Sequence, residues 1–143
     1  MLIKPPLRGI DSWGSGKYHA SRIGRLHNGV DIACYPGSII HSVTHGTVER
    51  IGVPYSPEDP NMYKRDLQLL EVNLDGNLFR YFYISPLVGV GDVVAPGDQI
   101  GISQDLSKIF PGITEHIHFE WKLPDGDYRD PTDLVSPKIR SIT

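Results

Sequence analysis

The sequence has little of three features that would place it in a specialised class of protein. Its 143 residues include a single cysteine, Cys34, so no disulfide can form within the chain. This indicates either a reducing compartment or a fold that does not rely on disulfides. No apolar run approaches the ~18 residues of a membrane-spanning helix, and Lys and Arg form no basic cluster. We therefore expect neither a membrane nor a nucleic acid as partner.

The beginning of the sequence also lacks the features of a secretory signal. Residues 1–16 contain two prolines and no apolar run of about 7–15 residues, which such a signal requires. The remaining composition is that of an ordinary globular protein, with a net charge of -3 and 39% hydrophobic residues. A chain of this length predicts one domain over residues 1–143, with an extended N-terminal arm at 1–17 and a C-terminal tail at 135–143.

Glycine and proline are abundant, with 15 and 12 residues, and they lie singly along the chain as turn residues. No stretch longer than ten residues shows helical periodicity. The pattern predicts an all-β fold: a compact antiparallel sheet domain with long irregular loops. The clearest signal is a hairpin over 67–84 around Asp75-Gly76, the residue pair typical of a type I′ turn.

Other segments fit the same fold class. The run 38–53 predicts two strands interrupted near His45-Gly46, 54–65 a proline-rich loop, and 88–103 very short strands separated by turns. The last strong strand is 115–123, and one short helical turn follows within 130–135. Trp13 and Tyr18 are the expected anchors of the N-terminal segment.

Two short motifs contain residues that bind metals. In His116-Ile117-His118 both imidazoles share one face of a strand, while Ile117 and Phe119 enter the core. Glu120 follows on the imidazole face, where it can orient a ring. The alternative interpretation of this motif is an ordinary polar strand face.

The second motif places His27 and Asp31 four residues apart, with Gly29 between them allowing a tight backbone path. The alternative here is a surface turn in which Asp31 caps nearby amides. Together the two motifs supply two histidines and one aspartate as ligands, with one further histidine. Three protein ligands and one open position are typical of a catalytic zinc site, so we expect Zn²⁺ as cofactor.

The remaining candidates carry weaker signals. His41 and His45 are expected at ordinary polar positions, and His19 is a candidate for lining the site because it precedes the first ligand. Cys34 is interpreted as a small buried residue, since nothing around it indicates an activated thiol.

The motifs HNGVDI, GVGDVVAPGDQIG and EHIHFEW occur in the order found in lysostaphin-type zinc endopeptidases, which this sequence resembles over residues 18–134. The resemblance implies a zinc groove with His27, Asp31 and His118 as metal ligands and His116 as a catalytic residue. It also implies cleavage of peptidoglycan peptides.

The sequence departs from that family at one catalytic position. The family has a second catalytic histidine in a YxHL-like strand, and Tyr83 stands at the matching place in YFYISP. A phenol is a poor general base at neutral pH but a good hydrogen-bond donor, so Tyr83 is a candidate for stabilising an oxyanion. The alternative is a packed aromatic side chain.

The segments YFYISP and PGITEHIHFE resemble the vertebrate leukocyte cell-derived chemotaxin branch more closely. That branch keeps the zinc and the fold but is regarded as non-catalytic. It is also secreted and disulfide-bonded, which we do not expect of a sequence with one cysteine and no recognisable signal. The sequence thus leaves two functions: a zinc endopeptidase, or a zinc-stabilised binding or structural module. For the enzyme, the missing signal favours a virion-associated bacteriophage wall hydrolase, cytoplasmic before release, with phage tail or baseplate proteins as partners.

Overall fold

The computed structural model of the protein describes residues 21–22 and 25–135. The predicted arm at 1–17, the anchors Trp13 and Tyr18, and His19 all lie outside the described residues. So does the predicted C-terminal tail except for its first residue. That residue, Val135, ends a 3-10 helix and is buried.

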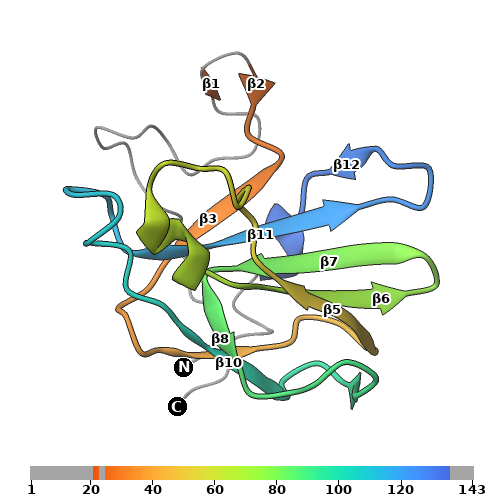
Figure 1. The fold of residues 1–143 in the computed structure, drawn as a ribbon. Helices are drawn as coiled ribbons and strands as arrows, with labels where there is room; N and C mark the ends of the chain where they lie inside the picture. Colours follow the sequence, from red (N-terminus) through yellow and green to blue (C-terminus); the bar gives the residue numbers. More distant parts are fainter. Residues whose placement is uncertain (1–20, 23–24, 136–143) are drawn as a thin grey trace.

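Within these residues the structure is almost entirely β, as predicted, and every strand pairing is antiparallel (Figure 1). No helix in the described part is long and apolar enough to cross a membrane. The strands are β1 (Ser21–Arg22), β2 (Arg25–Leu26), β3 (Gly29–Ala33), β4 (Ile39–His41), β5 (Gly46–Gly52), β6 (Leu69–Leu74), β7 (Asn77–Phe82), β8 (Ile84–Pro86), β9 (Val93–Val94), β10 (Gln99–Ser103), β11 (His116–Lys122) and β12 (Tyr128–Arg129). Two 3-10 helices complete the list, η1 (Met62–Asp66) and η2 (Thr132–Val135).

A large sheet carries the strands in the order β12-β11-β7-β6-β5-β9. Strand β3 also pairs with β11, from His116 opposite Ala33 to Glu120 opposite Gly29. Strand β12 pairs with the end of β11, at Trp121 and Lys122. From His118 to Lys122 the strand β11 therefore lies between β7 on one side and β3 and β12 on the other, whereas His116 and Ile117 pair with β3 alone.

A smaller sheet, β4-β10-β8, lies beside the large one (Figure 1). Apolar side chains of both sheets join in one core. From the large sheet come Val30, Ile32, Val48, Leu70, Val72, Phe79, Tyr81, Ile117 and Phe119, and from the small one Ile40, Ile84 and Ile100. Burial of this apolar area is the main force that holds the sheets together.

The β6–β7 hairpin forms as predicted, with Leu74 opposite Asn77 and Asp75-Gly76 as the two-residue turn. Both turn residues have positive φ, 52° at Asp75 and 86° at Gly76. A type I′ turn requires positive φ at both positions, which aspartate and glycine tolerate best.

The large sheet has one apolar face and one polar face. Because side chains alternate along a strand, Ile117 and Phe119 of β11 lie in the core. The intervening His116, His118 and Glu120 share the opposite face, as predicted. The functional side chains described below belong to this second face.

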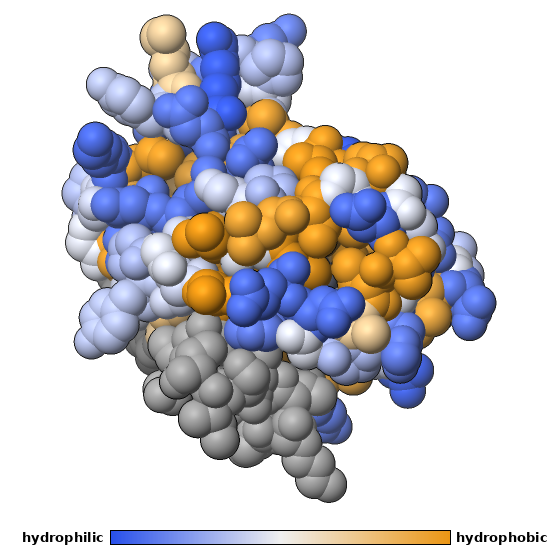
Figure 2. All heavy atoms as spheres, turned by 90° about the horizontal axis from the view of Figure 1, so that it is seen from below, coloured by the Kyte–Doolittle hydropathy of each residue, from blue (hydrophilic) through white to orange (hydrophobic). Residues whose placement is uncertain are grey.

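Large apolar side chains are also exposed outside the core, among them Leu87, Val90 and Val93 in and next to the β8–β9 connection. Figure 2 shows the molecule from below, with apolar surface interrupted by hydrophilic groups. Exposed apolar residues interspersed with polar ones are ordinary on a protein surface.

Candidate metal centre and active site

The antiparallel pairing of β3 with β11 brings the two motifs together. Asp31 lies directly opposite His118 in the register of these strands, and His27 precedes β3 by two residues. The Nδ1 atom of His118 lies 2.9 Å from Oδ1 of Asp31 and 2.9 Å from Nε2 of His27. Nε2 of His27 is 3.1 Å from the same carboxylate oxygen. All three side chains are buried.

This triangle of atoms fits a divalent metal. With both histidine rings neutral, each of the three atoms can offer a lone pair, and each lies within 3.1 Å of the other two. Protons cannot satisfy three mutual contacts of this kind with good geometry, whereas one cation can accept all three lone pairs. Tetrahedral zinc at about 2.0–2.1 Å from its ligands separates them by about 3.3 Å. His27, Asp31 and His118, which the sequence predicts as ligands, therefore form a group that can hold a metal.

Glu120 determines which nitrogen of His118 faces the other ligands. Its Oε1 lies 2.9 Å from Nε2 of His118. A carboxylate only accepts hydrogen bonds, so Nε2 carries a proton and the neutral ring has its lone pair on Nδ1. Glu120 thus holds the ring in the tautomer that a metal requires, as the sequence predicts.

The charges of the site are strongly coupled. Burial alone would lower the pKa of His118, but hydrogen bonds to Asp31 and Glu120 outweigh it and raise the pKa to about 9. Burial would likewise raise the pKa of Asp31, yet hydrogen bonds with His118 and His27 hold it well below its usual value. Without a metal, these contacts therefore favour the charged form of Asp31 and the protonated form of His118.

His116 lies beside the donor set with a different orientation. Its Nδ1 is 2.6 Å from the carbonyl oxygen of Thr114, which can only accept, so this nitrogen carries the proton. The other nitrogen, Nε2, lies 3.6 Å from Oδ2 of Asp31. In the neutral ring the Nε2 lone pair therefore faces the metal ligands, which is the geometry of a general base.

Tyr83 also reaches the site. Its ring meets that of His116 edge to face, with 5.6 Å between ring centroids. Its backbone has φ of 73°, a conformation that bulky residues adopt rarely and that accompanies functional sites. Two hydrogen bonds hold this backbone, from its N–H to the carbonyl of Gln68 and from the N–H of Gln104 to its carbonyl.

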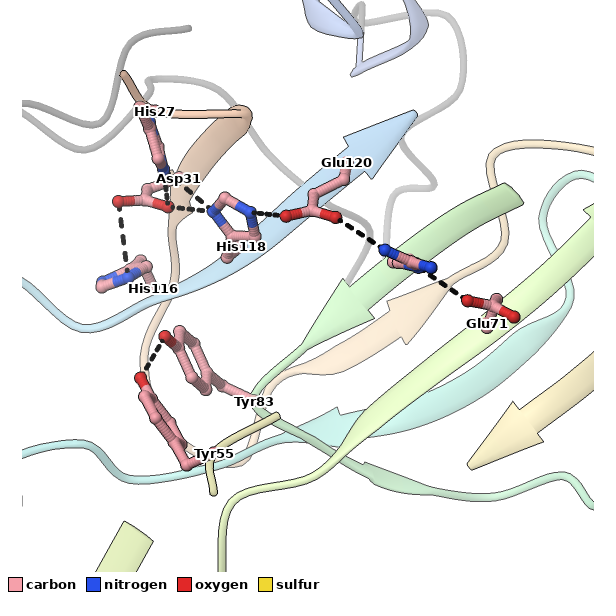
Figure 3. Close-up of polar contacts among 9 residues, drawn as sticks. His27, Asp31, Tyr55, Glu71, Tyr83, His116, His118 and Glu120 are labelled. Carbon is pink, nitrogen blue, oxygen red and sulfur yellow. Dashed lines mark hydrogen bonds and ion pairs between the residues drawn. The ribbon is translucent and has the colours of Figure 1, made fainter. Parts of the chain in front are cut away.

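The sequence analysis does not identify Tyr55, which contacts Tyr83 directly. The two hydroxyl oxygens are 2.7 Å apart (Figure 3). Tyr55 belongs to the predicted loop 54–65, and the ammonium group of Lys64 lies 4.9 Å from the centre of its ring. A tyrosine in a proline-rich loop gives no signal of its own, because only the folded loop carries it to the site.

Two further charged residues, Glu71 on β6 and Arg80 on β7, are equally unmarked in the sequence and lie behind Glu120.

The remaining predicted candidates are His41, His45 and Cys34. His45 is exposed, whereas His41 is buried, so the expectation of two ordinary polar positions fits His45 better. Cys34 is partly buried against the core, and burial raises its pKa to about 11, in agreement with an unreactive thiol.

The fold and the site together define a class of protein: an antiparallel β domain in which two paired strands and the residue before them bring together two histidines and an aspartate that can hold a metal. The chain belongs to peptidase family M23, whose profile matches residues 25–131. It shares 33% identity with leukocyte cell-derived chemotaxin-2 of Mus musculus over 126 residues, covering 88% of this chain and 77% of the relative. The Bos taurus protein of the same name shares 32%.

Solved structures show the same fold. The structure of LytU has a TM-score of 0.60 at 26% identity, covering 91% of this chain and 87% of that chain. The catalytic domain of the antimicrobial peptidase lysostaphin from Staphylococcus simulans has a TM-score of 0.60 at 23% identity, covering 87% and 90%. The similarity to lysostaphin and to the chemotaxin branch predicted from the motifs is thereby confirmed.

Proposed function

We propose that the protein is a zinc-dependent endopeptidase that cleaves peptide bonds in peptidoglycan. One observation carries the proposal: His116 lies beside a three-ligand metal centre with its Nε2 lone pair facing that centre. A purely structural metal site has no use for such a base. Membership of a peptidase family supports the same reaction class.

In this mechanism His27, Asp31 and His118 would hold a zinc ion. A zinc ion in a three-ligand site lowers the pKa of a bound water and polarises a carbonyl oxygen. His116 accepts the proton of the attacking water at Nε2 and returns it to the leaving amine. The Thr114 carbonyl stabilises the doubly protonated ring, because it accepts the hydrogen bond from Nδ1 throughout.

Tyr83 supplies a hydrogen bond to the oxyanion that develops on the scissile carbonyl. Its hydroxyl can donate there when Tyr55 donates to it, and the 2.7 Å contact between the two hydroxyls permits this direction. A hydrogen bond accepted by Tyr83 also makes its own proton a better donor. Tyr83 thereby takes the oxyanion-stabilising part of the catalytic machinery, while His116 remains the base.

The test is to incubate the zinc-loaded protein with purified peptidoglycan and to measure newly released amino groups. We expect release by the wild-type protein and none above background by His116→Ala that retains its zinc. Equal release by the two proteins, or none by either with zinc confirmed bound, would refute the peptidase.

A second function, a zinc-stabilised binding module without catalysis, is favoured by two observations. Tyr83 replaces the second histidine, and His27, Asp31, His116 and His118 expose no more than 9% of their surface. The peptidoglycan assay separates the two functions, because a zinc-loaded binding module would release no amino groups, whatever partner it binds.

Delivery by a bacteriophage virion, with tail or baseplate proteins as partners, stays a prediction from the sequence. Its test is to look for the protein in purified virions by mass spectrometry. Absence from intact virions would exclude this part of the proposal and leave the reaction unaffected.

A further inference from the structure

Behind the metal ligands, three charged side chains form a row across the polar face of the large sheet. Glu71 on β6 lies directly opposite Arg80 on β7, and Arg80 lies directly opposite Glu120 on β11. The Nε of Arg80 is 2.6 Å from Oε2 of Glu71. One terminal nitrogen of the same guanidinium is 3.6 Å from Oε2 of Glu120. Figure 3 shows Glu71 and Glu120 at the two ends of this row.

The row continues into the metal centre. The oxygen of Glu120 that does not face Arg80 lies 2.9 Å from Nε2 of His118. One carboxylate therefore connects the guanidinium to a metal ligand. Within the described residues, Oε2 of Glu120 is buried without a hydrogen bond, so the ion pair with Arg80 is the interaction that compensates it.

Burying this row of charged side chains costs free energy, so its presence calls for a reason other than filling the space. Glu71 and Glu120 expose 5% and 7% of their surface, and buried charges lose hydration that an ion pair only partly restores. With His118 neutral, the carboxylates of Asp31, Glu71 and Glu120 carry three negative charges. Arg80 carries one positive charge, so two negative charges remain uncompensated. A divalent cation bound by His27, Asp31 and His118 supplies two positive charges at that place.

We infer that Arg80, braced by Glu71, is a positioning residue for the metal centre. It fixes the Glu120 carboxylate so that this group accepts the Nε2 proton of His118 and leaves Nδ1 for the metal. The inference rests on the metal site of the proposed function but not on the peptidase reaction. Without Arg80, Glu120 loses its charged partner and the His118 ring loses its fixed orientation.

The test measures the Kd for zinc by competition with a chelator of known affinity, at one fixed pH. Groups that orient metal-binding histidines typically change metal affinity about 10- to 100-fold. We expect Arg80→Met to raise the Kd by about this factor. The matched control is Lys122→Met, which removes one positive charge from the same face of β11, two residues beyond Glu120.

A second readout reports the orientation of the ring. In the zinc-loaded wild-type protein, NMR should show a slowly exchanging proton on Nε2 of His118. In Arg80→Met this proton should exchange faster, and in Lys122→Met it should not change. A purely structural role of Arg80 would lower the melting temperature without moving this signal.

If Arg80→Met does not fold, Arg80→Lys carries the test, because lysine keeps the charge but not the planar fork that spans two carboxylates. A Kd raised more than about threefold over that of Lys122→Arg supports the inference, and a smaller change contradicts it. Wild-type protein that binds no zinc would overturn the inference together with the metal site. A zinc-binding protein that releases no amino groups would overturn only the peptidase.

Discussion

The two histidines of β11 present different ring nitrogens to the site because different acceptors hold their rings. The Thr114 carbonyl fixes the proton of His116 on Nδ1, whereas the Glu120 carboxylate fixes that of His118 on Nε2. Nδ1 of His118 therefore faces the other two ligands, and Nε2 of His116 lies on the side of Asp31, 3.6 Å from its Oδ2. The two residues share a strand face and differ in chemistry.

This difference predicts separable losses in two variants. His118→Ala should lose both zinc and activity, because it removes one of three ligands. His116→Ala should keep one zinc per chain and lose activity, since general bases contribute about 10²–10⁴-fold to rates. Zinc content by atomic absorption and amino-group release from peptidoglycan measure the two effects. Loss of zinc from His116→Ala would show that His116 is itself a ligand.

The tyrosine pair predicts a graded effect on turnover. Tyr83→Phe should lower kcat by about 10²–10³, the usual loss when one oxyanion donor is removed, and should leave zinc affinity unchanged. Tyr55→Phe should lower kcat by a smaller factor, because Tyr83 remains. Tyr63→Phe is the control, since Tyr63 is exposed on η1. An unchanged kcat in Tyr83→Phe would mean that Tyr83 is only a packed aromatic.

Cys34 should be slow to alkylate. Burial raises its pKa from the ordinary 9.0 to about 11, so the thiolate fraction near neutral pH is about 100-fold lower than that of a free thiol. Its alkylation rate by iodoacetamide should keep rising with pH beyond 9, where a free thiol levels off. The raised pKa also affects stability. The thiol of the unfolded chain ionises at lower pH than the buried thiol, so the free energy of unfolding should fall as the pH rises above about 9. Mass spectrometry of native and guanidinium-unfolded protein gives the comparison, and equal rates would contradict the prediction.

At the scale of secondary-structure elements, the site depends on the close approach of β3 to β11. A Cβ atom at Gly29 would lie 2.2 Å from the backbone oxygen of Phe119 and 3.0 Å from the His118 ring. No side chain fits there without moving one strand away from the other. The glycine of the HNGVD motif is therefore required for packing between strands, in addition to any tight local turn.

Gly29→Ala should consequently weaken zinc binding as well as stability. Moving β3 separates Asp31 from His118, and we expect destabilisation of about 1–3 kcal/mol. Gly52→Ala serves as control, because a Cβ there meets only the flexible side chain of Arg50. Denaturant unfolding and chelator competition measure the two effects. Similar results for both variants would argue against the strand contact.

Local elements of the fold could be predicted because their signals are local. Asp75-Gly76 fixes the β6–β7 turn through its positive φ angles, and alternation in β11 separates core from site. The sequence predicts only a loop over 54–65, whereas the structure has the 3-10 helix η1 at its end. The side chain of Asn61 caps this helix by accepting a hydrogen bond from the N–H of Tyr63. A single turn of this kind has too few residues for a periodic pattern.

The complete site could not be derived from local patterns. His27 and His118 are 91 residues apart, and only the pairing of β3 with β11 brings them together. The resemblance to a known family supported combining the two motifs in one site, whereas periodicity did not, and neither predicted the strand pairing itself. Glu71, Arg80 and Tyr55 belong to no motif, since their roles arise from cross-strand register and from the path of a loop.

For the whole molecule, metal and stability should be linked. A ligand that binds only the folded state adds about 2.7 kcal/mol when its free concentration is 100 times its Kd. For a chain of this size, excess chelator should lower the Tm by about 5–10 °C. His118→Ala should show no response to chelator. An unchanged Tm in the wild-type protein would contradict the metal centre.

The metal-binding residues come from two segments that are far apart in the sequence, one at His27 and Asp31 and the other at His118. Asp31 and His118 are 87 residues apart, and strands β4 to β10 all lie between them. A metal ion bound at this place would act as a reversible cross-link that closes a long loop, and cross-links that close long loops stabilise most in theory. We expect proteases to cleave the protein faster wherever zinc is scarce, so the supply of free zinc would set its lifetime.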